Sequence, residues 1–126
     1  MSPEVISTVI KAYFAALREM DQRAWVNTFA EDAISHDPMG APPIVGHQRL
    51  GEFFDTITAA FKKVGLTEDV IFIAGDGAAV KWTGRGTSKQ GRDVRFEGID
   101  VFEINAAGKI QTLRAYWNPA EMVAQL

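Results

Sequence analysis

The first half of the chain carries apolar residues at helical spacing. Residues 2–4, Ser-Pro-Glu, are typical of a helix start, with a hydroxyl cap, a proline in the first turn and an acid beside it. The apolar positions of this helix form one broad stripe: Val5, Ile6, Val9, Ile10, Tyr13, Phe14, Leu17 and Met20. A second, shorter helix capped by Asp21 is predicted to about residue 30, and a third from Gly46 to about residue 63. The pattern thus predicts three N-terminal helices.

From Glu68 onward the hydrophobic period changes from helical spacing to two. Strands are predicted at 68–74, 78–88, 91–104 and 109–117, separated by glycine-containing segments typical of hairpins. Three helices followed by an antiparallel meander indicate an α+β fold, in which a curved sheet packs on the helices. Because the strands have one polar face, the helices are expected on the other face.

Length, charge and composition exclude several classes of protein. At roughly 150 residues per domain, the 126 residues form a single domain, 1–126. The chain has no cysteine, which excludes disulfides and thiolate chemistry. Its formal net charge of −3 gives no reason to expect a nucleic-acid partner. The plainly apolar run at residues 70–74 is far shorter than the roughly 20 residues of a membrane span, and no signal-peptide pattern is visible. We therefore expect no membrane partner and a cytoplasmic location.

No motif for a metal or a phosphate cofactor is complete. His36 and His47 lack the paired spacing of metal ligands. Gly86 and Gly91 have the spacing of a phosphate-binding loop, but Arg92-Asp93 follows where Lys-Ser/Thr is required. The glycine motifs of nucleophile elbows and dinucleotide sites are absent from the sequence. What remains is acid–base chemistry by carboxylates and a phenol, so we expect no cofactor and no metal.

Asp100 breaks the apolar pattern of its predicted strand. The even positions of residues 92–104 include Val94, Phe96 and Phe102, so Asp100 lies in register with the core face. A carboxyl group there must be paired or must keep its proton, because burial disfavours the charged form. No basic residue is nearby on that face. From the strand alone, an Asp that accepts backbone hydrogen bonds, or one exposed by a one-residue bulge, is the preferred interpretation.

Two more polar residues stand out from their surroundings. Tyr13 lies on the apolar stripe of the first helix, where a buried phenol needs a hydrogen-bond partner. A core tyrosine is the commoner interpretation of such a position. Asp37 precedes Pro38 in a loop, residues 36–43, that three prolines make stiff. Acids before proline are usually solvated, but one that such a loop holds against a pocket would stay basic.

Three segments and one tyrosine resemble bacterial ketosteroid isomerase, the steroid Δ5-isomerase. The segments are 37–46 (DPMGAPPIVG), 98–102 (GIDVF) and 108–117 (GKIQTLRAYW), and the tyrosine is Tyr13. The resemblance runs over about residues 5–120 in the family's order. Such short motifs recur across the wider SnoaL-like and nuclear transport factor-like superfamily. The specific part is the coincidence of Tyr13, Asp37 and Asp100.

The resemblance implies a fold, a reaction and three catalytic residues. The fold would be a cone, in which three N-terminal helices pack in the concave face of a curved, mainly antiparallel sheet, usually as a homodimer. Asp37 would be the general base that moves a proton within a Δ5-3-ketosteroid, and Tyr13 and the protonated Asp100 would stabilise the dienolate oxygen. A carboxylic acid kept neutral in an apolar site is an established feature of that family. The implied steroid-binding wall consists of Leu17, Met39, Phe54, Phe96 and Trp117.

The chain departs from the family pattern behind the catalytic phenol. Phe29 and Phe54 stand where well-studied members have hydrogen-bonded tyrosines, so Tyr13 is expected to be a weaker donor. A Phe54→Tyr variant with unchanged turnover and unchanged phenol titration would contradict this expectation. His36 directly precedes the base and is expected to point out of the pocket. The peptide bond between Asp37 and its proline can be cis.

Two other functions stay open at this point. A different enzyme on the same cone, such as a dehydratase, an epoxide hydrolase or a polyketide cyclase, would need other polar groups, for example a His–Asp pair. A non-catalytic binder of apolar ligands would have no need for a base opposite two donors. The outer face of the sheet, with Ile99 and Val101 among charged residues, is the expected contact of a homodimer.

Overall fold

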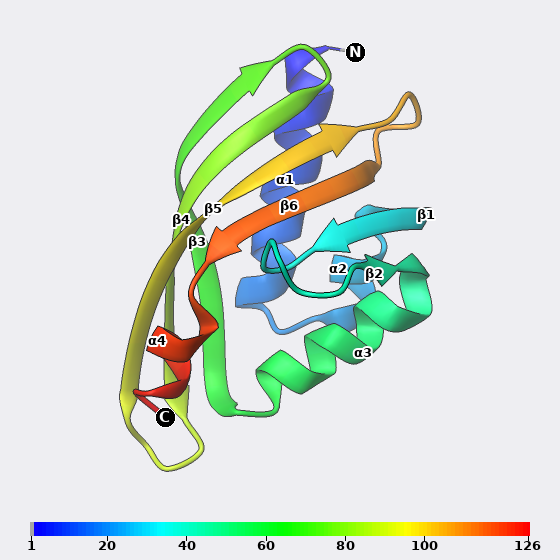
Figure 1. The fold of residues 1–126 in the computed structure, drawn as a ribbon. Helices are drawn as coiled ribbons and strands as arrows, with labels where there is room; N and C mark the ends of the chain where they lie inside the picture. The colour runs from blue at the N-terminus through cyan, green and yellow to red at the C-terminus, as the bar shows by residue number, and fades with distance from the viewer. Residues whose placement is uncertain (1) are drawn as a thin grey trace.

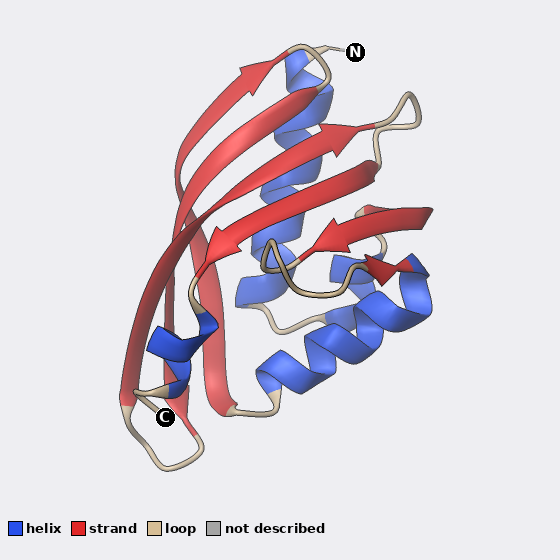
Figure 2. Cartoon of the chain, viewed as in Figure 1, coloured by secondary structure: helices blue, strands red, loops and turns tan. Residues whose placement is uncertain are grey.

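The computed structural model describes residues 2–126 as a curved sheet with helices on its concave side (Figure 1; Figure 2). The helices are α1 (Pro3–Arg18), α2 (Gln22–Val26), α3 (Gly46–Thr58) and α4 (Pro119–Val123). The strands are β1 (Phe29–His36), β2 (Ile44–Val45), β3 (Phe61–Ala74), β4 (Gly77–Ser88), β5 (Asp93–Ile104) and β6 (Ile110–Trp117). This arrangement confirms the predicted α+β class.

The first two helices begin at the caps that the sequence indicated. The Ser2 hydroxyl accepts a hydrogen bond from the Val5 N–H, and the Asp21 carboxylate accepts one from the Ala24 N–H. Along α1 the predicted apolar stripe is largely buried, and Tyr13 is part of it. The helices therefore present their apolar faces to the sheet.

The six strands form one sheet in the order β2-β1-β6-β5-β4-β3. Neighbouring strands are antiparallel except β1 and β6, which run parallel. In Figure 1 the long strands β3, β4 and β5 bend around α1 and continue beyond it, while α3 crosses near their far ends. The mainly antiparallel, curved sheet thus encloses α1 and α3 on one side, as the cone expectation required.

The segment between α2 and β3 differs from the sequence prediction. Helix α2 ends at Val26 instead of near residue 30, and Phe29 begins strand β1. The pairing of β1 with β6 shifts register between Phe29 and Ile34, so burial along β1 does not alternate and the period-two signal is lost. Helix α3 ends at Thr58, and residues 61–67, expected outside the sheet, form the first half of β3.

A short C-terminal helix was also missed. Helix α4 has 5 residues, too few for a hydrophobic period to show, and its cap is Asn118, whose side chain accepts from the Ala120 N–H. Gln125, just after it, bonds the backbone of Arg95 on β5, which holds this end of the chain against the sheet.

The core lies between the helices and the concave face of the sheet. Its largest fully buried side chains include the aromatic residues Trp25, Trp82, Phe14, Phe29, Phe61 and Phe102. Within residues 2–126, no helix has the length and apolar character needed to cross a membrane.

Candidate active site

A deep, mostly apolar pocket opens between the inner face of the sheet and helices α1 and α3. The space between its lining atoms is about 610 Å³, a figure that includes the open mouth. Its walls are mainly aromatic and aliphatic: Leu17, Trp25, Phe53, Phe54, Ile57, Val64, Leu66, Trp82, Phe96 and Trp117. Three acidic side chains also line it, namely Tyr13, Asp37 and Asp100.

These three acidic groups come from separate parts of the chain. Helix α1 carries Tyr13, strand β5 carries Asp100, and Asp37 directly follows β1. The structure brings all of them to one pocket although they are far apart in sequence. Their protonation states decide what the pocket can do.

Tyr13 is a neutral hydrogen-bond donor at ordinary pH. Its side chain is 2% exposed and packs edge-on against Phe14 and Phe102. Burial raises the pKa of Tyr13 well above its usual value of 10.0, and the nearby carboxyl groups of Asp100 and Asp37 raise it further. The nearby Trp25 indole acts in the opposite direction on the same pKa. The phenol therefore keeps its proton.

Asp100 is buried and keeps its proton as well. It is 2% exposed and pairs with Val80 on β4 and with Ala115 on β6, in the middle of the sheet. Burial raises the pKa of Asp100 well above its usual 3.8, the charge of Asp37 adds to this, and the nearby Trp82 indole opposes it. A protonated carboxyl donates one hydrogen bond.

The structure also tests the two interpretations that the sequence favoured for Asp100. No bulge interrupts β5 at this position, so the side chain is not turned to solvent. Its Oδ2 atom has no hydrogen-bond partner among the described residues, so it is not a carboxylate held by backbone N–H groups. Both of the preferred interpretations of the strand were therefore wrong.

Asp37 is the one acid of the three that is ionised at neutral pH. Its Oδ1 atom accepts a hydrogen bond of 2.6 Å from the Trp117 indole N–H. Burial raises the pKa of Asp37 to about 6, and the hydrogen bond from Trp117 works against this rise. The Asp37–Pro38 peptide bond is cis. The loop is tied to the sheet by the Met39 N–H, which donates to the Ala115 carbonyl at 2.8 Å.

The structure places four of the five expected wall residues at the pocket. Leu17, Phe54, Phe96 and Trp117 line it. Met39 does not, because the loop turns its side chain outward and leaves it 40% exposed. Sequence reasoning did not assign Trp25 or Trp82 to the wall, but both line the pocket.

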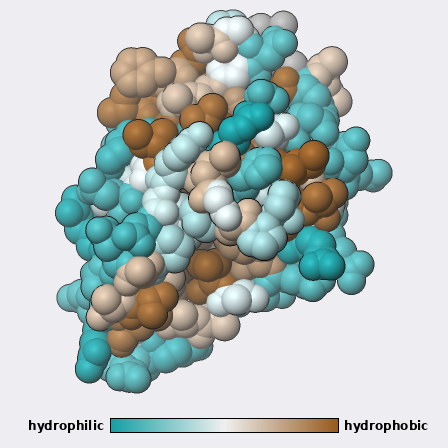
Figure 3. Space-filling view, in the orientation of Figure 1, coloured by the Kyte–Doolittle hydropathy of each residue, from teal (hydrophilic) through white to brown (hydrophobic). Residues whose placement is uncertain are grey.

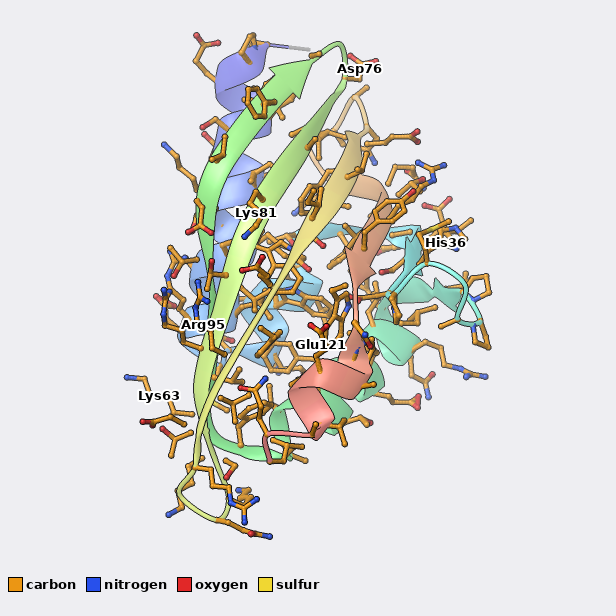
Figure 4. The ribbon with its side chains drawn as sticks, turned by 60° about the vertical axis from the view of Figure 1, so that its left-hand side comes forward. His36, Lys63, Asp76, Lys81, Arg95 and Glu121 are labelled. Atoms are coloured by element: carbon orange, nitrogen blue, oxygen red, sulfur yellow. The ribbon has the colours of Figure 1, made fainter. Side chains whose placement is uncertain are left out.

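The surroundings of the phenol match the expected departures from the family. Phe29 lies beside Tyr13 with ring centroids 5.9 Å apart, and Phe54 packs on Trp25 at 5.3 Å. Neither phenylalanine has a hydroxyl group that could form a hydrogen bond with Tyr13. His36 is the last residue of β1, pairs with Arg114, is not part of the pocket lining, and lies toward the edge of the molecule in Figure 4.

This arrangement is suited to proton transfer at carbon beside a carbonyl group. A base that is ionised at neutral pH shares with two neutral donors a pocket that has few other polar atoms. Preorganised donors in such a site stabilise negative charge as it develops on an oxygen. Among residues 2–126, no three His, Cys, Asp or Glu side chains are grouped so that they could hold a metal ion.

Comparison with solved structures shows how common the fold is. A Mycobacterium tuberculosis protein in complex with estradiol-17beta-hemisuccinate has a TM-score of 0.81 at 24% identity, over 93% of this chain and 96% of that one. SalBIII, an epoxide hydrolase/cyclase-like enzyme in the formation of the pyran ring of salinomycin, has a TM-score of 0.83 at 24% identity, over 94% of each chain. At these identities the likeness establishes the cone fold alone.

Comparison of sequences is more specific. A family model described as a SnoaL-like domain matches residues 10–113. The Steroid Delta-isomerase of Nocardioides simplex is 32% identical over 124 residues, which cover 98% of this chain and 97% of that protein. The chain therefore belongs to the ketosteroid isomerase family, within the SnoaL-like superfamily.

Proposed function

We propose that this protein is a steroid Δ5-isomerase, which converts a Δ5-3-ketosteroid into the conjugated Δ4 isomer. The observation that carries the proposal is the placement of ionisable Asp37 in one apolar pocket with the neutral donors Tyr13 and Asp100. A relative named Steroid Delta-isomerase supports the same reaction. The ligand is a small, apolar steroid.

The reaction needs one base and two donors. The Asp37 carboxylate removes a proton from the carbon between the 3-ketone and the double bond, and the C–H electron pair moves into a dienolate. The oxygen of this dienolate takes the negative charge and accepts hydrogen bonds from Tyr13 and from protonated Asp100. Asp37 then returns its proton to the far end of the dienolate, so the base is regenerated and no atom is gained or lost.

The pKa of each group fits its role. A general base works best when its pKa lies near the working pH, and the value of about 6 for Asp37 meets this condition. The raised pKa values of Tyr13 and Asp100 keep both groups protonated, as hydrogen-bond donors must be. The walls around them, including Leu17, Phe54, Phe96 and Trp117, exclude water and offer flat apolar surfaces to steroid rings.

The proposal is tested by mixing the protein with a Δ5-3-ketosteroid and following the absorbance of the conjugated enone. We expect turnover in the unchanged protein and a loss of at least about 100-fold in kcat in Asp37→Asn, which cannot act as a base. The control is Asp93→Asn, an exposed position on β5 outside the pocket, which should keep full activity. Binding of the steroid without turnover would favour a non-catalytic binder of apolar ligands and reject the isomerase.

We also propose that the protein forms a homodimer through the outer face of its sheet. Val70, Ile99 and Tyr116 lie in one row across β3, β5 and β6, and each is between 44% and 50% exposed. Phe72, in the next row, is 71% exposed. Figure 3 shows apolar residues interspersed with polar ones on the face of the molecule that includes this sheet. Burial of such a row against a second copy would remove apolar surface from water.

A further inference from the structure

All three tryptophans of the chain line the pocket, one near each acidic group. The Trp117 indole already donates to Asp37. The other two have a different status. Among residues 2–126, the buried side-chain polar atoms without a hydrogen-bond partner are Trp25 Nε1, Trp82 Nε1 and Asp100 Oδ2. Buried donors are nearly always satisfied in folded proteins, so two orphaned N–H groups around one pocket call for an explanation.

The phenol of Tyr13 is the polar side-chain group that lies next to the Trp25 indole. The centroid of its indole is 5.7 Å from that of the Tyr13 ring, and the rings of Phe29 and Phe54 lie at 4.9 and 5.3 Å from it. Since the two phenylalanines have no polar side-chain atom, only the Tyr13 oxygen can accept the indole hydrogen within this aromatic cluster. The influence of Trp25 on the pKa of Tyr13 agrees with this pairing.

Trp82 lies in the equivalent relation to Asp100. On β4 it pairs with Gly98 of β5, so Asp100 is its diagonal neighbour on the same face of the sheet, at a distance that long side chains can bridge. Gly98 leaves room for the indole: a Cβ atom there would lie 2.6 Å from Cζ2 of Trp82. The unpartnered Nε1 of Trp82 and the unpartnered Oδ2 of Asp100 are a donor and an acceptor that match.

We propose that Trp25 and Trp82 are positioning residues of the oxyanion site, whose indole N–H groups bond Tyr13 Oη and Asp100 Oδ2 once a ligand oxygen sits between the two catalytic donors. The inference rests on the proposed isomerase function. Hydrogen bonds at such sites are often long without ligand and tighten in the complex. As charge develops on the ligand oxygen, part of it passes to Tyr13 and Asp100, and each indole then stabilises its partner.

The proposal also accounts for the missing tyrosines. Phe29 and Phe54 supply no hydroxyl group to Tyr13, and a lone phenol would be a weaker donor. The Trp25 N–H supplies the second donor from helix α2, and the Trp82 N–H does the same for Asp100 from strand β4. Two indoles, each held by close packing, thus replace a chain of phenols.

The first test is spectroscopic and needs no turnover. Protein labelled with ¹⁵N-tryptophan has three indole signals, which Trp→Phe variants assign. The probe is estradiol, whose phenolic A ring places an oxygen where the dienolate oxygen would form. We expect the Trp25 and Trp82 indole protons to move downfield on saturation, and the Trp25 shift to vanish in Tyr13→Phe while the Trp82 shift persists. If neither proton moves, or if the Trp25 shift survives in Tyr13→Phe, the proposal is overturned.

The second test separates hydrogen bonding from packing. Trp25→Phe should lower kcat about tenfold, the effect of one lost hydrogen bond, with little change in KM. It should also raise the pKa of Tyr13, read from ¹³C-tyrosine in a Tyr116→Phe background, where Tyr13 is the one remaining tyrosine. Replacement of Trp25 by β-(3-benzothienyl)alanine keeps the ring shape without the N–H. If this isostere restores both the rate and the phenol titration, Trp25 acts by packing and the proposal fails.

The two proposals can fail separately. Absence of isomerase activity together with intact indole shifts would reject the isomerase and leave the four donors as a binding site for a ligand oxygen. Isomerase activity with unmoved indoles would reject the role of Trp25 and Trp82 alone.

Discussion

Among single residues, Asp37 sets the pH range in which the proposed reaction can run. Only its carboxylate form can take a proton, and its pKa is about 6. We therefore expect kcat/KM to be constant above about pH 7 and to fall about tenfold for each pH unit below 6. Because the hydrogen bond from Trp117 lowers this pKa, Trp117→Phe should move the acid limb to higher pH. A pH–rate profile checks this, and an acid limb at the same pH in Trp117→Phe would contradict it.

Asp37 should also make folding stability depend on pH. Its pKa in the folded chain, about 6, lies above the usual 3.8, so the folded state binds the proton more tightly and loses stability as pH rises from about 4 to 6. Asp37→Asn removes this loss and keeps an oxygen for the Trp117 bond. The variant should gain roughly 2–3 kcal/mol of unfolding free energy at pH 8 and almost nothing at pH 4.

Urea unfolding at the two pH values measures both quantities. Asp93→Asn, at an exposed position on β5, is the matched control and should change neither value by more than about 0.5 kcal/mol. A stability gain in Asp37→Asn that is the same at pH 4 and pH 8 would show that the carboxylate is not desolvated in the folded protein.

The sequence identified some site residues and could not have identified others. Helical spacing put Tyr13 on a buried stripe, and strand parity put Asp100 on the core face, because both signals are local. Asp37 had no periodic signal, since its loop has no period; the stiff proline loop marked it as a candidate, and the family resemblance gave it the role of base. Met39 was expected at the pocket wall, but the turn of the loop directs it outward. The role of the Trp82 N–H depends on a neighbour in another strand, which no local pattern encodes.

Among the elements, β4, β5 and β6 pack closely around Gly98. A Cβ atom at this position would lie 2.6 Å from Cζ2 of Trp82, 2.6 Å from the Tyr116 carbonyl oxygen and 2.7 Å from Cβ of Trp117. Since neither the backbone nor the packed rings can yield easily, Gly98→Ala should destabilise the protein by about 1–3 kcal/mol. The added methyl group should also displace the side chains of Trp82 and Trp117 and thereby lower kcat.

Chemical denaturation and the enone assay measure these two effects. Glu97→Ala, the preceding residue on the exposed side of β5, is the control and should change the unfolding free energy by no more than about 0.5 kcal/mol. Unchanged stability in Gly98→Ala would mean that the strands can move apart here at no cost in free energy. It would also weaken the argument that the absence of a side chain at Gly98 lets Trp82 lie close to Asp100.

Elements were predictable where their periodicity is local and regular. The sequence located α1 and strands β4, β5 and β6 to within a few residues, because apolar stripes, caps and glycine turns mark them. Strand β1 was missed because its register shift against β6 removes the alternation. The start of β3, residues 61–63, was assigned to a helix because Phe61 is buried in either structure, and only pairing with β4 decides between them.

At the scale of the whole molecule, the exposed apolar row on the outer sheet face predicts association. Ile99 lies at the centre of this row, between Val70 and Tyr116, with the side chain of Lys81 (Figure 4) in the same row. An acidic residue at position 99 would be costly to bury against a second copy, because an interface core excludes unpaired charge. We therefore expect Ile99→Asp to sediment as a single chain of 13.8 kDa, while the unchanged protein sediments at twice that mass. Val5→Asp places the same charge at a 43% exposed position on α1, which packs on the other side of the sheet, and should leave the dimer intact. Sedimentation of the unchanged protein as a single chain, or equal dissociation of both variants, would remove the outer face as the interface.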